Sequence, residues 1–273
     1  MQGEKNNIMN KKIAIIGGGN LGTAIAEGLI QSGFVLPKHI LITKRNIHTL
    51  HEMERKGVLV SDKNEEAVRY ADLIILAVKP FQVNDVVTAL KKEFKEERHV
   101  LVSVVTGVNI QQISEIIGKK IPIIRAMPNT AIAIQESMTC IAAKDANEEQ
   151  LQYVHDIFNQ LGKAVRIDEK LMNAATVLGA CGTAFAMRYI RANIQGGIEI
   201  GFDAVTANLI AAQTVKGAAE LLLQKGTHPE QEIDKVTTPK GCTIAGLNEM
   251  EHQGFSSSVI RGIAASFNKI LKG

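Results

Sequence analysis

Short apolar runs alternate with longer amphipathic segments from Lys12 to about Asp168. The runs are rich in Val, Ile and Leu, as expected of strands that are covered on both faces of a sheet. Helical segments such as Asn20–Ser32, Val83–Lys92 and Glu148–Leu161 lie between them. This alternation predicts right-handed βαβ units and an N-terminal Rossmann-type sheet, doubly wound and mainly parallel. The predicted strands are Lys12–Ile16, His39–Thr43, Gly57–Val60, Asp72–Val78, His99–Val104, Pro122–Met127, Met138–Ala142 and Lys163–Ile167.

The pattern changes after Asp168, because the rest of the chain shows helical periodicity and no convincing strand. We therefore predict two domains. An α/β domain covers residues 1–168, of which residues 1–10 are expected to form a polar tail, and an all-helical domain covers residues 169–273.

Three long helices are predicted in the C-terminal region. An apolar segment, Leu171–Gln195, precedes a helix over Ala204–Lys225, which Asp203 would cap and Gly226 would end. A last helix opens at Ser256–Ser258. The first two helices are apolar over more than one face, and one small bundle covers such a surface poorly. We therefore predict self-association, at least a dimer, through the helical domain.

The composition excludes several classes of protein. A formal charge of +3 over 273 residues is too small and too scattered for a nucleic-acid-binding face. Aromatic residues make up only 4%, Trp is absent, and no apolar run is long enough to cross a bilayer. The three cysteines match no zinc or redox spacing, so we expect no metal site and a reducing, cytoplasmic location.

A glycine-rich turn joins the first predicted strand to the first predicted helix, in the order Gly17-Gly-Gly19-Asn-Leu-Gly22. Gly17 would permit the tight turn, Gly19 would let a pyrophosphate approach the backbone, and Gly22 would let helix and strand pack closely. The N-terminus of the helix would present free N–H groups to the anion. The motif therefore predicts a dinucleotide site, against the alternative of a tight turn that binds no ligand.

The end of the second strand indicates which dinucleotide is bound. NAD-dependent enzymes normally place an acidic residue about twenty residues after the turn. No Asp or Glu occurs between Glu27 and Glu52, and Lys44 and Arg45 stand there instead. These cations could pair with a 2′-phosphate, although two solvated turn residues would look the same in sequence. We therefore predict NADPH in preference to NADH, with Lys79 beside the nicotinamide half.

Three motifs occur in the order typical of one enzyme family: Ala77–Pro80, Arg125–Thr130 and Val236–Leu247. Together they make the chain resemble pyrroline-5-carboxylate reductase over nearly its whole length from Lys12. That family reduces the cyclic imine 1-pyrroline-5-carboxylate to L-proline, in the last step of proline biosynthesis. The resemblance implies the same reaction here.

The resemblance also assigns roles to residues. It places the substrate carboxylate and ring against Lys240–Thr243, with Glu169 nearby, and it matches Thr243 to the family's residue that hydrogen-bonds the imine nitrogen. The implied substrate contacts are Glu169, Gly241, Cys242 and Thr243. The cofactor contacts, implied together with those from the turn, are Ile16, Gly17, Gly18, Gly19, Asn20, Leu21, Gly22, Lys44, Arg45, Asn64, Ala77, Val78, Lys79, Pro80, Val104, Val105, Thr106 and Lys235.

The chemistry of imine reduction suits these residues. Pro239 is expected in or near the first turn of a helix that runs to about Gln253, with free N–H groups at Gly241, Cys242 and Thr243 for a carboxylate. A protonated imine is already an electrophile, so the site mainly has to orient two reactants. Thr243 could also be only a helix-start residue.

Some positions depart from the family pattern and keep other functions open. Lys240 stands in a turn that is usually glycine-rich, and Leu178–Ala184 replaces a stretch that is usually rich in Gly, Ser and Pro; Ala131 stands where proline is common. One alternative is a β-hydroxyacid-type dehydrogenase, with Lys216 as its acid. Another is a non-catalytic NADPH-binding regulatory protein.

Overall fold

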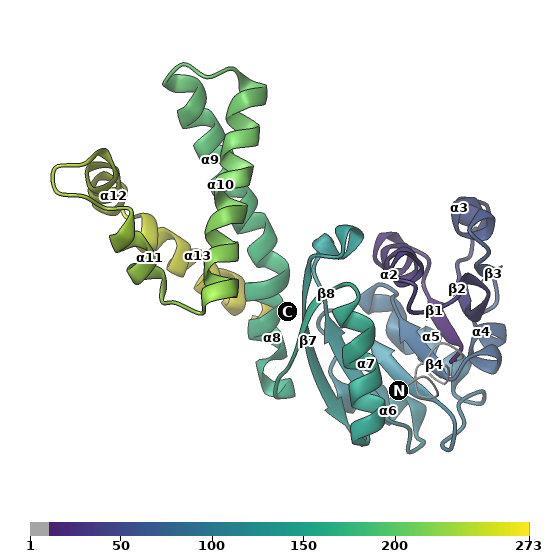
Figure 1. The fold of residues 1–273 in the computed structure, drawn as a ribbon. Helices are drawn as coiled ribbons and strands as arrows, with labels where there is room; N and C mark the ends of the chain where they lie inside the picture. The colour runs from purple at the N-terminus through teal and green to yellow at the C-terminus, as the bar shows by residue number, and fades with distance from the viewer. Residues whose placement is uncertain (1–10, 273) are drawn as a thin grey trace. The chain divides into compact units, whose positions relative to one another are not determined.

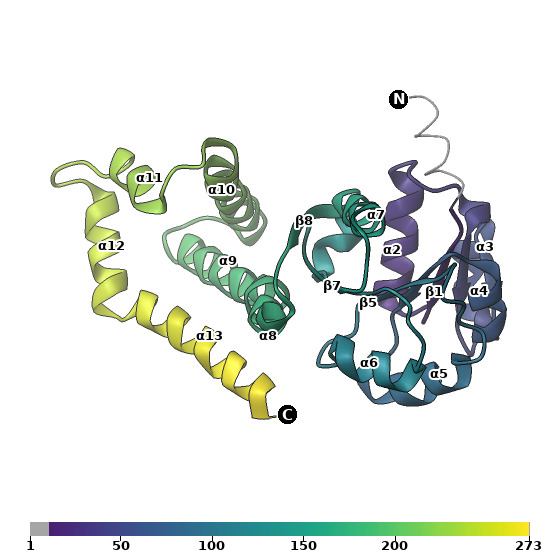
Figure 2. The same cartoon turned by 90° about the horizontal axis from the view of Figure 1, so that it is seen from below.

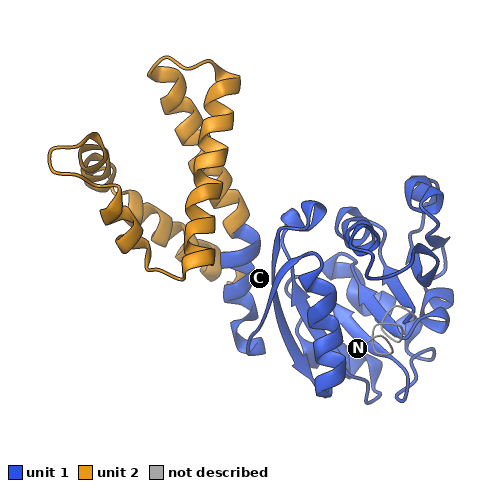
Figure 3. Cartoon of the chain, in the orientation of Figure 1, with its two compact units in different colours: residues 1–181 blue, residues 182–273 orange. Residues whose placement is uncertain are grey.

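The computed structural model describes residues 11–272, so the predicted tail, residues 1–10, lies outside the described residues. The chain divides into two compact units, residues 1–181 and residues 182–273 (Figure 3). The sequence had suggested a boundary after Asp168, whereas the contacts group residues 169–181 with the first unit. None of the described helices is both long and apolar enough to span a bilayer.

An eight-stranded sheet forms the centre of the first unit, in the order β3-β2-β1-β4-β5-β6-β7-β8 (Figure 1). Neighbouring strands are parallel except β6 and β7, which are antiparallel. The predicted doubly wound, mainly parallel sheet is therefore confirmed, with shifted strand ends. The strands are β1 (Ile13–Ile16), β2 (Ile40–Thr43), β3 (Leu59–Ser61), β4 (Leu73–Leu76), β5 (Val100–Ser103), β6 (Ile123–Met127), β7 (Ser137–Lys144) and β8 (Gly162–Arg166).

Helices cover both faces of this sheet, and alternate strand residues point to opposite faces. Ile13 and Ile15 of β1 belong to one buried cluster with α2 and α7, while Ala14 and Ile16 belong to another with α4, α5 and α6. Figure 2 shows α2 and α7 on the side opposite α5 and α6. The helices of this unit include α2 (Asn20–Gln31), α3 (His51–Arg55), α4 (Asn64–Tyr70), α5 (Val83–Leu90), α6 (Ile110–Ile117) and α7 (Glu148–Asn159).

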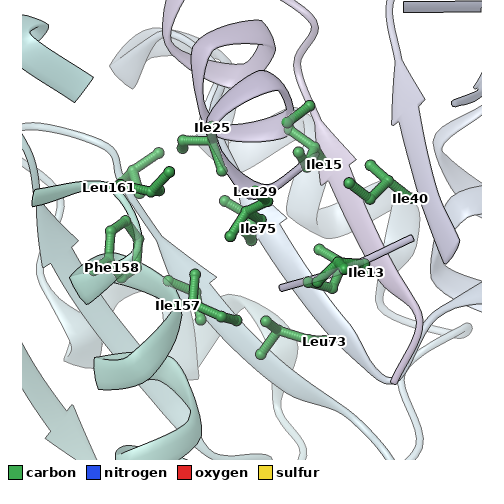
Figure 4. Packing of buried hydrophobic residues seen from close by; sticks show 14 of the residues in the cluster. Ile13, Ile15, Ile25, Leu29, Ile40, Leu73, Ile75, Ile157, Phe158 and Leu161 are labelled. Atoms are coloured by element: carbon green, nitrogen blue, oxygen red, sulfur yellow. The ribbon is translucent and has the colours of Figure 1, made fainter. Parts of the chain in front are cut away.

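The first cluster packs apolar side chains of the helices against those of the strands. Figure 4 shows Ile25 and Leu29 of α2 beside Ile15 and Ile75 of the sheet, with Phe158 of α7 nearby. All five side chains are fully buried. This burial fixes the start of α2 against the end of β1, where the glycine-rich turn lies.

A helical segment of changing pitch follows the sheet. The sequence predicted one apolar helix over Leu171–Gln195, and this prediction is wrong in detail. The chain forms α8 (Met172–Ala175), then a π-helical turn over Thr176–Cys181, then α9 (Gly182–Glu199). A π-helical turn is wider than an α-helical one and is frequently found at functional sites. Periodicity alone could not show it.

The second unit is all-helical, as predicted. It contains α9, α10 (Ala204–Lys225), α11 (Pro229–Lys235), α12 (Cys242–His252) and α13 (Phe255–Lys272). The predicted caps of α10 are confirmed, since Asp203 accepts hydrogen bonds from the N–H groups of Val205 and Thr206 at 3.0 Å and Gly226 adopts φ 63° at the C-terminus. Helices α9 and α10 pack side by side (Figure 1).

Candidate active site

A cavity of about 1090 Å³ opens in the first unit, at the carboxyl ends of the central strands. This is the edge at which open α/β sheets bind ligands. Of the expected cofactor contacts, only Ile16, Gly22 and Lys235 do not line it. The expected contacts that line it are Gly17, Gly18, Gly19, Asn20, Leu21, Lys44, Arg45, Asn64, Ala77, Val78, Lys79, Pro80, Val104, Val105 and Thr106.

The glycine-rich turn forms one end of the cavity. Gly17 has φ +112°, and a Cβ atom there would lie 2.5 Å from the carbonyl oxygen of Ala77. A Cβ on Gly22 would lie 2.1 Å from the carbonyl oxygen of Gly17, so Gly22 and Ile16 are buried parts of the support behind the turn. A Cβ on Gly19 would meet nothing within 4 Å. The turn therefore leaves open space over Gly19, as a bound pyrophosphate requires.

The start of α2 can take a negative charge. Its first turn contains no acidic residue, and Gly19, the N-cap residue, has no side chain that could cap the N–H groups. Asn20 and Leu21, the first two residues of the helix, both line the cavity. Uncapped N–H groups and the helix dipole attract anions. The residues present therefore fit the phosphate groups of a dinucleotide.

Two cations stand at the end of β2. Lys44 is half-buried and Arg45 is exposed, and neither has an ion-pair partner among the described residues. Beside them, the buried hydroxyl of Thr43 donates to Oδ1 of Asn64 at 2.5 Å, which fixes the Asn64 amide at the start of α4. Unpaired cations beside an oriented amide suit a 2′-phosphate on an adenosine ribose.

The lining of the cavity also includes residues that the sequence analysis did not assign to the cofactor. Asn129 and Thr130 follow β6, and Ala180 comes from the π-helical turn. The Asn129 side chain donates to the carbonyl oxygen of Gly179 at 3.2 Å and accepts from the N–H of Ala131 at 3.0 Å. The motif Arg125–Thr130 was the available signal, but sequence alone did not show that its end reaches the cavity.

Glu169, an expected substrate contact, lies at the start of residues 169–181. Its Oε1 atom accepts a hydrogen bond from the N–H of Ile110 at 2.7 Å and lies 3.3 Å from Nη1 of Arg125. Arg125 is only 4% exposed, and its Nε and Nη2 atoms have no hydrogen-bond partner among the described residues. Burial lowers the pKa of Arg125, and the Glu169 carboxylate partly offsets this effect.

The other expected substrate contacts lie at the start of α12 in the second unit. Pro239 lies near the first turn and not in it, because the helix begins at Cys242 and Lys240, between them, adopts φ +60°. The N–H of Gly241 is not free, since it donates to the carbonyl oxygen of Thr238 at 3.0 Å. Cys242 and Thr243, the first two residues of the helix, remain as the N–H groups that can face a carboxylate.

Lys235 and Lys216, two lysines of the second unit to which the sequence analysis gave a role, differ in their surroundings. Lys235, an expected cofactor contact, ends α11, and its Nζ atom lies 2.5 Å from Oε1 of Glu232. Lys216, the acid of the dehydrogenase alternative, is exposed on α10. The ion pair of Lys235 reduces the charge that it can offer to a ligand.

Known proteins share the sequence of both units. A family profile described as "Pyrroline-5-carboxylate reductase dimerisation" matches residues 169–272, and one described as "NADP oxidoreductase coenzyme F420-dependent" matches residues 12–107. Pyrroline-5-carboxylate reductase 1 of Dictyostelium discoideum is 46% identical over 94% of this chain. The chain spans about half of the length of that relative, 49%.

Two further proteins match along their whole length. Pyrroline-5-carboxylate reductase 2 of Dictyostelium discoideum is 43% identical over 96% of this chain and 93% of its own. The crystal structure of Plasmodium falciparum pyrroline carboxylate reductase with NADP bound is 28% identical, has a TM-score of 0.85, and covers 96% of this chain and 98% of its own. With the cavity and the glycine-rich turn in place, these similarities establish the family. The chain belongs to the pyrroline-5-carboxylate reductase family.

Proposed function

We propose that this chain reduces 1-pyrroline-5-carboxylate to L-proline with NADPH, the last step of proline biosynthesis. The observation that carries the proposal is the cavity, whose lining joins an open glycine-rich turn to two unpaired cations in a chain of this family. Family membership favours this reaction over the β-hydroxyacid-type alternative. A non-catalytic NADPH-binding protein remains an outcome of the experiment below.

The proposed cofactor site follows the cavity from end to end. The turn from Ile16 to Gly22 would hold the pyrophosphate, and Lys44, Arg45 and Asn64 would hold the adenosine end with its 2′-phosphate. The cofactor, when bound, supplies a hydride for C5 of the imine. Ala77–Pro80 and Val104–Thr106 would line the rest of its path, and Lys235 is retained as a proposed contact on the nicotinamide side.

The proposed substrate site lies at the start of α12. The N–H groups of Cys242 and Thr243 would hold the carboxylate, with Gly241 shaping the turn through its bond to Thr238. The hydroxyl of Thr243 would hydrogen-bond the imine nitrogen and so fix the face of the ring. Such a site contributes mainly by orienting the reactants.

We further propose that the active form is at least a dimer in the cytoplasm. The exposed apolar residues of the second unit and its match to a dimerisation domain support the dimer. Three free cysteines, without a disulfide in the described residues, support a reducing compartment.

The purified chain should oxidise NADPH, followed at its absorbance maximum, only when 1-pyrroline-5-carboxylate is present, and proline should accumulate in equal amount. A 3-hydroxy acid with NADP⁺ serves as the matched assay for the dehydrogenase alternative. Turnover of the hydroxy acid alone would contradict the proposal. Tight NADPH binding without turnover of either substrate would favour the regulatory protein.

A further inference from the structure

The carboxylate of Glu169 joins three segments of the first unit that are distant in sequence. It accepts from the N–H of Ile110, the first residue of α6, and it lies beside Arg125 in the middle of β6. Glu169 itself opens the segment that ends in the π-helical turn. One oxygen atom, Oε1, makes both of these contacts.

Two of these segments form walls of the cavity. The turn between β5 and α6 lines it with Val104, Val105 and Thr106. The N–H of Val104 donates to the carbonyl oxygen of Leu76 at 3.0 Å, which fixes the strand side of the turn. After Thr106 the chain passes Gly107 at φ +78° and reaches the Ile110 N–H that Glu169 holds. Glu169 therefore fixes the end of this turn that leads into α6.

The other wall is the segment that begins at Glu169. Met172 is fully buried in a cluster with Met127 and Ala142, and Ala180 reaches the cavity eight residues later in the chain. Asn129 donates to the carbonyl oxygen of Gly179 from the neighbouring loop. Any displacement of Glu169 would therefore shift both walls of the same end of the cavity.

The ion pair of Glu169 and Arg125 leaves part of the Arg125 guanidinium without a hydrogen-bond partner among the described residues, so the loss of Glu169 should have a large effect. The Arg125 guanidinium is almost completely buried, and two of its nitrogen atoms have no partner in the described part of the chain. A buried ion pair is disrupted most when one partner is removed, because the other charge remains buried and unpaired. Glu169 is the carboxylate that compensates Arg125 in this structure.

We propose that Glu169 is a positioning residue, which together with Arg125 holds the β5–α6 turn and residues 169–181 at the spacing that the cofactor needs. This inference rests on the proposed function in one respect, namely that the cavity holds NADPH. Family resemblance implied only a substrate contact for Glu169.

The test compares Glu169→Gln alone with Glu169→Gln combined with Arg125→Met. The single variant leaves the guanidinium unpaired, and we expect it to raise the Kd for NADPH about tenfold and to lower kcat about tenfold to a hundredfold, because misplaced reactants react slowly. The KM for the imine at saturating NADPH should not change. Fluorescence titration of the purified oligomer gives Kd independently of turnover.

The double variant removes the buried charge but keeps a Gln oxygen that can accept from the Ile110 N–H. We expect it to recover the NADPH Kd to within about threefold of wild type, with non-additive effects in the double-mutant cycle. Glu169→Leu with Arg125→Met removes the acceptor as well and should stay impaired. Glu115→Gln, an exposed carboxylate on the same helix α6, is the matched control and should change nothing.

The outcomes are distinct. A raised imine KM with an unchanged NADPH Kd, not rescued by Arg125→Met, would make Glu169 a substrate ligand and overturn the proposal. Additive effects in the cycle would also overturn it. If Glu169→Gln does not fold, the two double variants still decide, because they carry no unpaired buried charge. A wild-type chain that binds NADPH without reducing the imine would contradict the proposed reaction while leaving the positioning role measurable through Kd.

Discussion

The two units of this protein bury their apolar residues to very different degrees. In the first unit, β1, β2, β4, β5 and β6 are buried along their whole length, and helices cover both faces of the sheet. In the second unit, the only buried hydrophobic residues in the described chain are Ile194, Ala207 and Ala211. Large apolar side chains stay open there, including Met187, Ile200, Val205, Leu209, Leu223 and Ile260.

The difference shows that only the first unit is complete within one chain. Burial of apolar surface is the main stabilising contribution to folding, and the first unit obtains it from its own helices. The second unit has longer helices than the first, and few of its own surfaces cover them. Large apolar side chains that are exposed together in this way mark an association surface. We propose that a second copy of the chain covers these side chains.

The largest effect is expected from a charge on the open face of α10. Leu209 is 68% exposed in the single chain, so Leu209→Asp should be nearly neutral if the second unit stays uncovered. If a second copy covers it, an unpaired carboxylate becomes buried, and the dimer Kd should rise by about a thousandfold or more. Analytical ultracentrifugation measures this. Leu59→Asp, on β3 of the first unit, should leave association unchanged, and a dimer unaffected by Leu209→Asp would contradict this interface.

A buried histidine should make the stability of the first unit depend on pH between about 6.5 and about 4. His99 is 1% exposed, and burial lowers its pKa from 6.5 to about 4. The folded state therefore favours the neutral ring, and the unfolding free energy should fall as the pH drops from about 6.5 to about 4, by about 3 kcal/mol in all. Urea unfolding at each pH measures it. His99→Gln should flatten this dependence while His252→Gln, on α12, should not; a flat wild-type profile would show that His99 titrates normally.

The two units should divide the binding of cofactor and substrate between them. Replacing Lys44 and Arg45 together with Ala should weaken NADPH binding about tenfold to a hundredfold or more, because a charge-assisted contact contributes about 1.5–3 kcal/mol. NADH binding should change little. Titration with each cofactor measures the ratio. Equal losses for NADPH and NADH would mean that these side chains do not contact the 2′-phosphate.

A matching change in the second unit should affect the substrate and leave the cofactor alone. Thr243→Val keeps the shape and removes one hydroxyl, so transition-state stabilisation should fall by about 1–3 kcal/mol, and kcat/KM by about fivefold to somewhat over a hundredfold. The Kd for NADPH should stay near that of wild type. Unchanged kcat/KM would make Thr243 a helix-start residue only. A folded variant with no activity would instead indicate that Thr243 transfers a required proton.

The smallest effect is expected at a strained turn in the second unit. Lys240 adopts φ +60°, a conformation that glycine reaches without steric strain. Lys240→Gly should therefore stabilise the second unit by up to about 1 kcal/mol, after allowance for the greater freedom of glycine in the unfolded chain. Thermal unfolding at fixed protein concentration measures the shift. Lys56→Gly, at φ −77° in the first unit, is the control and should not stabilise.

Much of the cofactor end could be predicted from local sequence. Strands rich in Val and Ile, a glycine-rich turn and missing carboxylates are short-range features, and the turn lines the cavity as expected. The antiparallel pairing of β6 and β7 was not predicted, because an apolar run carries no sign of its direction. Asn129 and Ala180 were missed for a related reason, since they meet at the cavity only through the fold.

The sequence by itself determined the class of the sheet, the dinucleotide turn and the all-helical second unit, because each depends on hydrophobic period and on residues adjacent in the chain. Only the tertiary structure decided which polar groups are free. It pairs the Gly241 N–H with Thr238 and binds the Glu169 carboxylate to the Ile110 N–H beside a buried Arg125. These assignments depend on contacts between segments far apart in the chain, or on backbone angles such as that of Lys240, and no local pattern specifies either.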